Sequence, residues 1–215
     1  SSNTVTINGT TVTATPATAT AQYTYTFKNW TNGTETVTGN LTVTANFERT
    51  TRTYTVSITV NNSSYGNVSQ TSVANVPYGT VITSSGTTVT INGTKVTATK
   101  ATDDAQYTYT FTGWDKEISE VTGDSTYTAT YKETLNKYKI IFEVDGKTEE
   151  VEYYYGELPT YDKVPQKSST AEFHYVFKGW DKEFSKVTES TTYVAQFEEL
   201  KNQYKVTWIV GDNKF

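Results

Sequence analysis

The chain has 215 residues, a net charge of -5 and no cysteine, and 14% of its residues are aromatic. The absence of cysteine excludes disulfides and cysteine-based zinc sites. The negative charge argues against a nucleic-acid partner, since phosphate binding needs clustered Lys and Arg. The sequence contains no apolar run long enough to cross a bilayer, so we expect no membrane insertion, and the N-terminal SSNTVTINGT does not have the pattern of a signal peptide.

Residues 1–50 have the pattern of β-strands. Alternating Thr and Val residues flank Asn8-Gly9, and both turn residues tolerate positive φ, which predicts a hairpin over 5–15. Aromatic residues then occupy every second position of 23–27, Trp30 follows, and a further alternating stretch comes after it. Patterns with a period of two predict a mainly β chain.

The same pattern returns further along the chain. Trp114 follows Trp30 at the same interval at which Val89 follows Val5. Residues 1–50 therefore match the C-terminal part of a first repeat in a long form, and 51–134 form a complete second repeat of the same form. The chain begins inside a repeat on this interpretation.

A third repeat spans 135–200. It begins at Tyr138, which follows Tyr54 at this same interval, but its start recurs at Tyr204 after a clearly shorter one. The difference in length falls mainly on the Asn-Gly hairpin, which is thus an accessory that the short form lacks. Residues 201–215 are the start of a truncated fourth repeat.

The third repeat defines the minimum unit. It consists of a hairpin about Asp145-Gly146, a proline-containing connector, an aromatic strand that ends at Trp180, and a closing strand over 191–197. Between the last two strands, Phe184 and Val187 have a spacing that allows one short helical turn, as do Ile118 and Val121 in the second repeat.

This pattern resembles the B-repeat of internalin B, also called the Listeria-Bacteroides repeat. The resemblance covers essentially the whole chain and rests on Tyr138, Gly146, Tyr155, Gly156, Tyr175, Phe177, Gly179, Trp180, Tyr193, Ala195 and Phe197. It implies small β-grasp-like modules with at most one short helical turn each, in an elongated array on a bacterial surface or secreted protein. The first repeat departs from the pattern, with Asn29 in place of the Gly before Trp.

A core role is predicted for the aromatic residues that recur at fixed offsets, because a repeated core needs the same large side chain in every copy. These residues are Trp30, Trp114, Trp180, Phe27, Phe111, Phe177, Phe47, Tyr131 and Phe197. The alternative is that the tryptophans are stacking platforms for sugars. Candidate ligand contacts are then Tyr153, Tyr154 and Tyr161.

No residue indicates a reaction. His174 is the only histidine, so no Ser-His or Cys-His pair recurs, and its place between Phe173 and Tyr175 predicts that it faces solvent. An acidic group follows at Glu149, Glu150 and Glu152. We interpret it as part of an alternating strand with a solvent-exposed face. We predict a non-enzyme with no catalytic residue, no metal and no cofactor. A calcium site at an Asp pair and a Lys-Asn isopeptide crosslink stay open.

The leading hypothesis is a non-catalytic stalk that displays other domains outside a bacterial cell, with a role in adhesion. The alternative is a binding module for a glycan or a host surface protein. The expected partners are the neighbouring domains of the same chain, and the expected state is a monomer. A third idea is head-to-tail strand exchange, since 204–215 offer a spare first strand.

Overall fold

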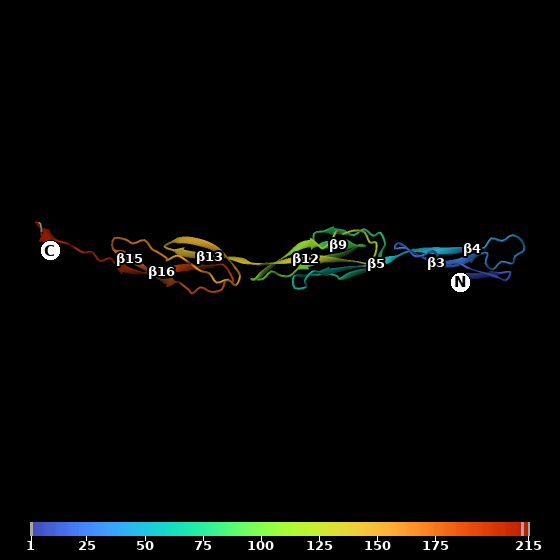
Figure 1. Cartoon of the computed structure of the whole chain (residues 1–215), viewed down its shortest axis with the longest axis horizontal. Coiled ribbons are helices and arrows are strands. Elements are labelled where there is room, and N and C mark those ends of the chain that lie inside the picture. The colour runs from blue at the N-terminus through green and yellow to red at the C-terminus, as the bar shows by residue number, and fades with distance from the viewer. Residues whose placement is uncertain (1, 212, 215) are drawn as a thin grey trace. The chain divides into compact units, whose positions relative to one another are not determined.

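The computed structural model describes residues 2–211, 213 and 214, and in this part of the chain it contains strands and loops but no helix (Figure 1). The predicted mainly β class is confirmed. The chain forms two compact units, one of residues 1–101 and 109–132, the other of residues 102–108 and 133–215. The finer division into four repeats stays a prediction, and we keep the names first, second and third repeat for the ranges given above.

The first repeat contributes two small antiparallel pairs to the first unit. The strands β1 (Thr4–Ile7) and β2 (Thr10–Thr13) form a hairpin whose turn residues Asn8 and Gly9 have φ of 48° and 79°. The predicted Asn-Gly turn is thus confirmed. The strands β3 (Tyr23–Thr31) and β4 (Thr44–Thr51) form the second pair, with a bulge between Phe27 and Asn29.

The second repeat has two four-stranded sheets. The first sheet has the order β11-β12-β5-β7, and its central strands β12 and β5 run parallel. Its bounds are β5 (Thr53–Val60), β7 (Ser72–Pro77), β11 (Tyr107–Trp114) and β12 (Ser125–Leu135). The second sheet has the order β6-β10-β9-β8. Its bounds are β6 (Gly66–Val68), β8 (Thr83–Ser85), β9 (Thr88–Ile91) and β10 (Thr94–Lys100).

The core of the second repeat lies between these sheets. Val56 and Ile58 of β5 pack with Val89, Ile91 and Val96 of the accessory hairpin, and all five side chains are buried. Strand alternation explains the pattern, because every second residue of β5 and of β9 points to the same side of its sheet. The accessory hairpin therefore contributes three buried side chains to this hydrophobic core.

The third repeat has one sheet of the same strand order, β14-β13-β16-β15, again with a parallel central pair, β13 and β16. Its bounds are β13 (Lys137–Val144), β14 (Lys147–Tyr154), β15 (Phe173–Trp180) and β16 (Thr191–Lys201). The order agrees with tandem modules. The β-grasp-like character stays an expectation, since no helix crosses the sheet in the described residues.

Larger side chains take the place of the missing second sheet. By the repeat offsets, Phe142 replaces Ile58 and Phe184 replaces Ile118, and the connector of the third repeat adds Tyr161. Phe142 is 1% exposed, and its ring centroid lies 4.9 Å from that of Tyr161 and 5.7 Å from that of Phe184. The short repeat thus closes its core with aromatic volume rather than with a hairpin.

The segment expected to form a helical turn is irregular in both repeats. In the third repeat Gly156 donates its backbone N–H to the carbonyl of Val187 at 2.8 Å, and Val187 donates to Glu157 at 2.8 Å. The same pair of bonds ties Val121 to Gly79 and Thr80 in the second repeat. Because these backbone groups bond to the connector, they are not free for bonds within a helix.

Past β16 the chain is extended and exposed. The side chains of Tyr204, Val206 and Trp208 are exposed, and two-residue strands β17 (Ile209–Val210) and β18 (Asn213–Lys214) form a small hairpin. Two residues of the predicted fourth repeat, 212 and 215, lie outside the described residues.

Candidate functional site

The three repeated tryptophans take part in aromatic clusters. Each follows a Phe of the same strand, with ring centroids 5.6 Å apart for Phe27 and Trp30 and 5.9 Å apart for Phe177 and Trp180. All three tryptophans are half-buried. In the third repeat Phe142 and Tyr161 also contact Trp180, with centroids 5.4 Å and 5.0 Å from its ring. These indoles pack against their own repeat.

The other predicted core residues lie beside the tryptophans. In each repeat the same Phe also meets an aromatic residue of the closing strand, at 6.0 Å, 5.5 Å and 5.9 Å. These pairs are Phe27 with Phe47, Phe111 with Tyr131, and Phe177 with Phe197. Tyr131 is buried, whereas Phe47 is 41% exposed.

The first repeat is more open than the second. An apolar groove of about 220 Å³ lies beside Trp30 and is lined by Val5, Ile7 and Val12 of the hairpin and by Val43. The indole nitrogen of Trp30 is buried without a hydrogen-bond partner, whereas Trp114 donates its N–H to the carbonyl of Gly86 at 3.2 Å. Gly86 stands in the turn between β8 and β9, and β8 has no counterpart among the described residues of the first repeat.

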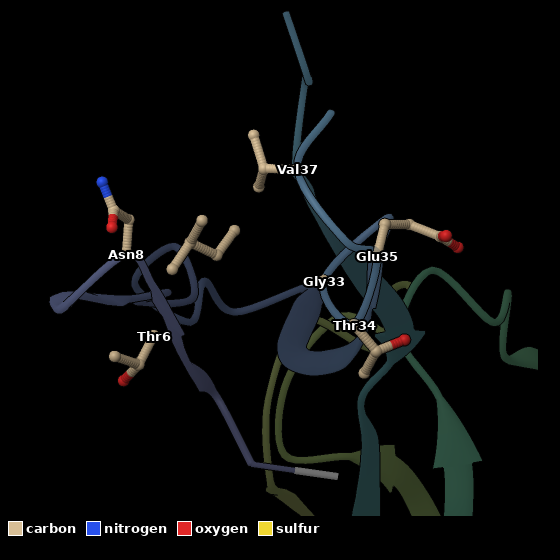
Figure 2. A pocket seen from close by; sticks show the side chains of 7 residues that line it. Thr6, Asn8, Gly33, Thr34, Glu35 and Val37 are labelled. Atoms are coloured by element: carbon tan, nitrogen blue, oxygen red, sulfur yellow. The ribbon is translucent and has the colours of Figure 1, made fainter. Parts of the chain in front are cut away.

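A larger pocket of about 530 Å³ lies between the same hairpin and the loop after β3. Figure 2 shows Asn8 on one side of this space and Glu35 on the other, with the Glu35 carboxylate pointing away from Asn8. Glu35 is the one charged residue of its lining, and the pocket is open to solvent. This geometry offers neither a nucleophile beside a base nor converging carboxylates.

The three candidate ligand tyrosines do not form one surface. Tyr153 and Tyr161 pack against the core of the third repeat, and the Tyr153 hydroxyl donates to the carbonyl of Thr160 and accepts from its N–H. Tyr154 is 43% exposed, and the ammonium of Lys137 lies 4.7 Å from its ring centroid. Strand alternation puts Tyr154 on the opposite face of β14 from Tyr153.

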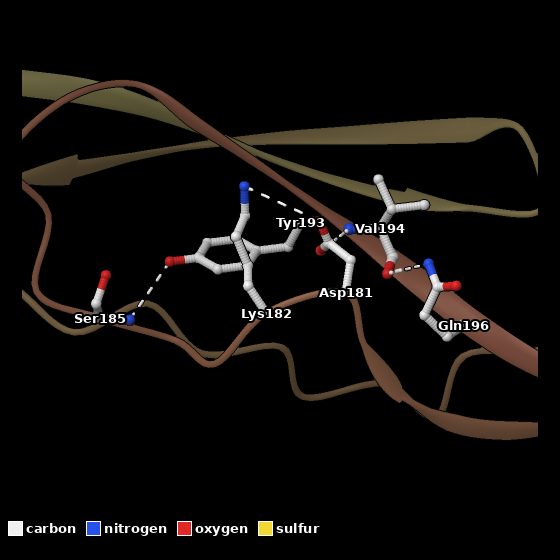
Figure 3. Close-up of polar contacts among 6 residues, drawn as sticks. All are labelled: Asp181, Lys182, Ser185, Tyr193, Val194 and Gln196. Atoms are coloured by element: carbon white, nitrogen blue, oxygen red, sulfur yellow. Dashed lines mark hydrogen bonds and ion pairs between the residues drawn. The ribbon is translucent and has the colours of Figure 1, made fainter.

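An aspartate fixes the loop that follows Trp114, and another fixes the loop that follows Trp180. Figure 3 shows Asp181 accepting the N–H of Val194 at 2.8 Å and Tyr193 accepting the N–H of Ser185 at 3.4 Å. The second repeat has the same bonds, from Thr128 to Asp115 at 2.8 Å and from Ser119 to Tyr127 at 3.4 Å. Sequence reasoning missed these aspartates, although their recurrence directly after the tryptophan was a readable signal.

Several other acidic residues are engaged in exposed pairs or turns. Glu149 bonds Lys163 at 2.6 Å and Glu150 bonds Lys139 at 2.9 Å, and these hydrogen bonds raise the pKa of both lysines. Asp104 accepts the N–H groups of Gln106 and Tyr107 at 2.7 Å each. Among the described residues no group of His, Asp and Glu side chains has the arrangement of a metal site. A search of the same residues for a helix long and apolar enough to cross a membrane finds none.

No family model matches the chain, and no curated relative matches it. The resemblance to the internalin B repeat therefore stays an expectation. Among solved structures, the chain is similar to the streptococcal high identity repeats in tandem (SHIRT) domains 3–4 of a cell surface protein, at 13% identity and a TM-score of 0.29. That match covers 69% of this chain and 99% of the other.

Proposed function

We propose that the chain is a non-catalytic repeat region of a bacterial surface or secreted protein and acts as a semi-rigid spacer between other domains. The second and third repeats carry the same strand order, and all three repeats carry the same Phe–Trp pair, while the surface charge differs. Residues 1–50 hold two basic and two acidic residues, whereas 135–200 hold eight Lys against thirteen Asp and Glu. The core is thus kept in every repeat while the surface charge is not. This is the pattern expected of a spacer, whereas a ligand site shared by the repeats would also keep its surface.

One observation carries the proposal. A single residue separates the closing strand of one repeat from the opening strand of the next: Arg52 stands between β4 and β5, and Asn136 stands between β12 and β13. A linker of one residue has few accessible conformations, in contrast to the long Gly/Ser linkers of flexible arrays. Consecutive repeats therefore have little freedom to rotate.

A distance measurement tests the spacer. Because the chain has no cysteine, Asn40→Cys and Lys186→Cys at exposed positions accept two spin labels for pulsed electron paramagnetic resonance. A semi-rigid spacer gives one narrow distance distribution. A control with four Gly-Ser pairs inserted after Asn136 sets the width of a flexible array, and an unmodified chain that is equally broad would refute the proposal.

The second candidate is a binding module for a glycan or a host protein. It is favoured by the exposed ring of Tyr154 with Lys137 beside it, a pairing that suits stacking on a sugar face. The test is a glycan array and a pull-down with the full chain. Saturable binding that is lost in Tyr154→Ala and kept in Tyr153→Phe would support it.

A further inference from the structure

The residue that links two repeats divides its backbone bonds between them. Asn136 donates its N–H to the carbonyl of Gln106, which belongs to the second repeat, at 2.9 Å. Its own carbonyl accepts the N–H of Tyr155, which belongs to the third repeat, at 2.9 Å. Arg52 bonds Gln22 and Tyr78 in the same way, at 2.9 Å each.

The side chain at this position strengthens the link. Asn136 donates both Nδ2 hydrogens to the loop before β11, to the carbonyls of Asp104 at 2.8 Å and Ala105 at 3.2 Å. Asn202 repeats these bonds to Thr170 at 2.9 Å and Ala171 at 3.1 Å. At the first link Arg52 takes the place of Asn and donates to the carbonyl of Thr20 at 3.1 Å.

A tyrosine shortly after the linking residue completes the arrangement. The Tyr138 hydroxyl donates to the carbonyl of Ala105 at 2.7 Å, Tyr54 donates to Ala21 at 2.5 Å, and Tyr204 donates to Ala171. We call the linking residue, this tyrosine and the loop they bind the joint. All partners of each joint lie within one compact unit.

The oxygen of the joint asparagine has a partner of its own. Thr108 donates its hydroxyl to Asn136 Oδ1 at 2.7 Å, and His174 Nδ1 lies 2.9 Å from Asn202 Oδ1. An amide oxygen can only accept, so His174 Nδ1 carries the proton and donates to Asn202 Oδ1. His174, which sequence reasoning left without a role, is thus part of the third joint.

The tyrosine bonds to a carbonyl 33 residues upstream in all three joints. The long and the short form of the repeat therefore join in the same way, although the two forms differ in length. The joint excludes the accessory hairpin and uses only the last part of one repeat and the first residues of the next.

We propose that the joint couples the folding of consecutive repeats, so that each repeat is stabilised by the one that follows it. The tyrosine bond exists only when both partners are folded, since it joins a loop of one repeat to the first strand of the next. In a linear array such interface bonds add to the intrinsic stability of each repeat. This inference deepens the spacer proposal, because coupling makes the array resist local opening.

The test is hydrogen exchange of the full chain, read at core amides of the second repeat such as Ile58, which bonds to the carbonyl of Thr71. Asn136→Ala with Tyr138→Phe removes the side-chain bonds of the joint and keeps the tyrosine ring. We expect second-repeat protection to fall about ten-fold, as the loss of a few hydrogen bonds predicts. We expect the pair Phe142→Ala and Trp180→Ala to unfold the third repeat. This pair should lower the protection of the second repeat at least as much as the joint substitutions do.

A variant that combines both pairs of substitutions shows whether the joint carries the coupling. If the joint carries the coupling, the joint substitutions add nothing once the third repeat is unfolded. Additive effects, or second-repeat protection that ignores the joint substitutions, would overturn the proposal. Tyr153→Phe is the matched control, because its hydroxyl bonds only within the third repeat, and it leaves the second repeat unchanged. If the coupling test fails while the spin-label distance distribution stays narrow, the proposed coupling is refuted and the spacer proposal is kept.

Discussion

The ring of Tyr131 lies directly over Gly66. A Cβ added at Gly66 would come 2.7 Å from Tyr131 Cε2 and 2.7 Å from the carbonyl oxygen of Thr99. Neither neighbour has room to move, since the tyrosine is buried with Ala98 and Ala129 and the carbonyl belongs to β10.

The first prediction concerns this contact. Gly66→Ala should destabilise the second repeat by about 1–3 kcal/mol, the usual cost of overpacking, as measured by urea unfolding. Gly123→Ala is the control, because a Cβ there meets no atom within 4 Å. It should be neutral or slightly stabilising, and equal losses at both positions would contradict the argument.

The second prediction concerns the hydroxyl of Tyr131. It is buried without a hydrogen-bond partner, and this burial raises the pKa of Tyr131 above its usual 10.0. Tyr131→Phe should stabilise the protein by about 1 kcal/mol, since an unpartnered hydroxyl loses its hydration. The chain supports the exchange, because Phe47 and Phe197 hold the equivalent positions.

The same hydroxyl has a consequence at alkaline pH. The folded state favours the neutral phenol, so this contribution to stability is full below pH 10.0 and is lost as the pH rises through the folded pKa. The free energy of unfolding should therefore fall further in the parent chain than in Tyr131→Phe, so that the difference in stability between the two proteins widens at alkaline pH. Parallel pH profiles for the two proteins would disprove this.

The third prediction separates a core indole from an exposed one. Trp180→Ala should cost about 3–5 kcal/mol, because the indole packs against Phe142, Tyr161 and Phe177. Trp208→Ala should leave stability unchanged, since that side chain is 72% exposed. Thermal unfolding of both variants checks the contrast, and a mild effect at Trp180 would argue for a ligand platform.

The fourth prediction uses the second joint to test the third. His174→Thr copies the position of Thr108, whose hydroxyl bonds Asn136, so exchange of the Asn202 amide should stay slow. His174→Ala leaves Asn202 Oδ1 without its partner, and we expect exchange about five-fold faster, as for the loss of one hydrogen bond. Equal rates in the two variants would remove His174 from the joint.

Much of the fold was readable because local chemistry decides it. Asn8, Asn92 and Asp145 take positive φ, each followed by a glycine that does the same, which is the turn that their sequence predicts. Period-two alternation likewise located β5, β12, β13 and β16, since one face of each is buried along part of its length.

The joint and the irregular loops were not readable in this way. A tyrosine that bonds a carbonyl 33 residues upstream leaves no periodic pattern, and the i, i+4, i+7 spacing of Phe184 was misleading because the backbone at Val187 bonds the connector. One signal was present: Asn-x-Tyr recurs at 136–138 and 202–204, with Arg-x-Tyr at 52–54.

The short repeat has three aromatic side chains where the long repeat has a second sheet, and this difference lies in the middle of the repeat. A stretch of sequence can enter or leave the middle of a repeat while its first strand and its last loop, the parts that meet a neighbour, stay as they were. Such a unit can be duplicated, shortened or reordered by recombination without redesigning its ends, so the number of repeats is free to vary among descendants of the gene.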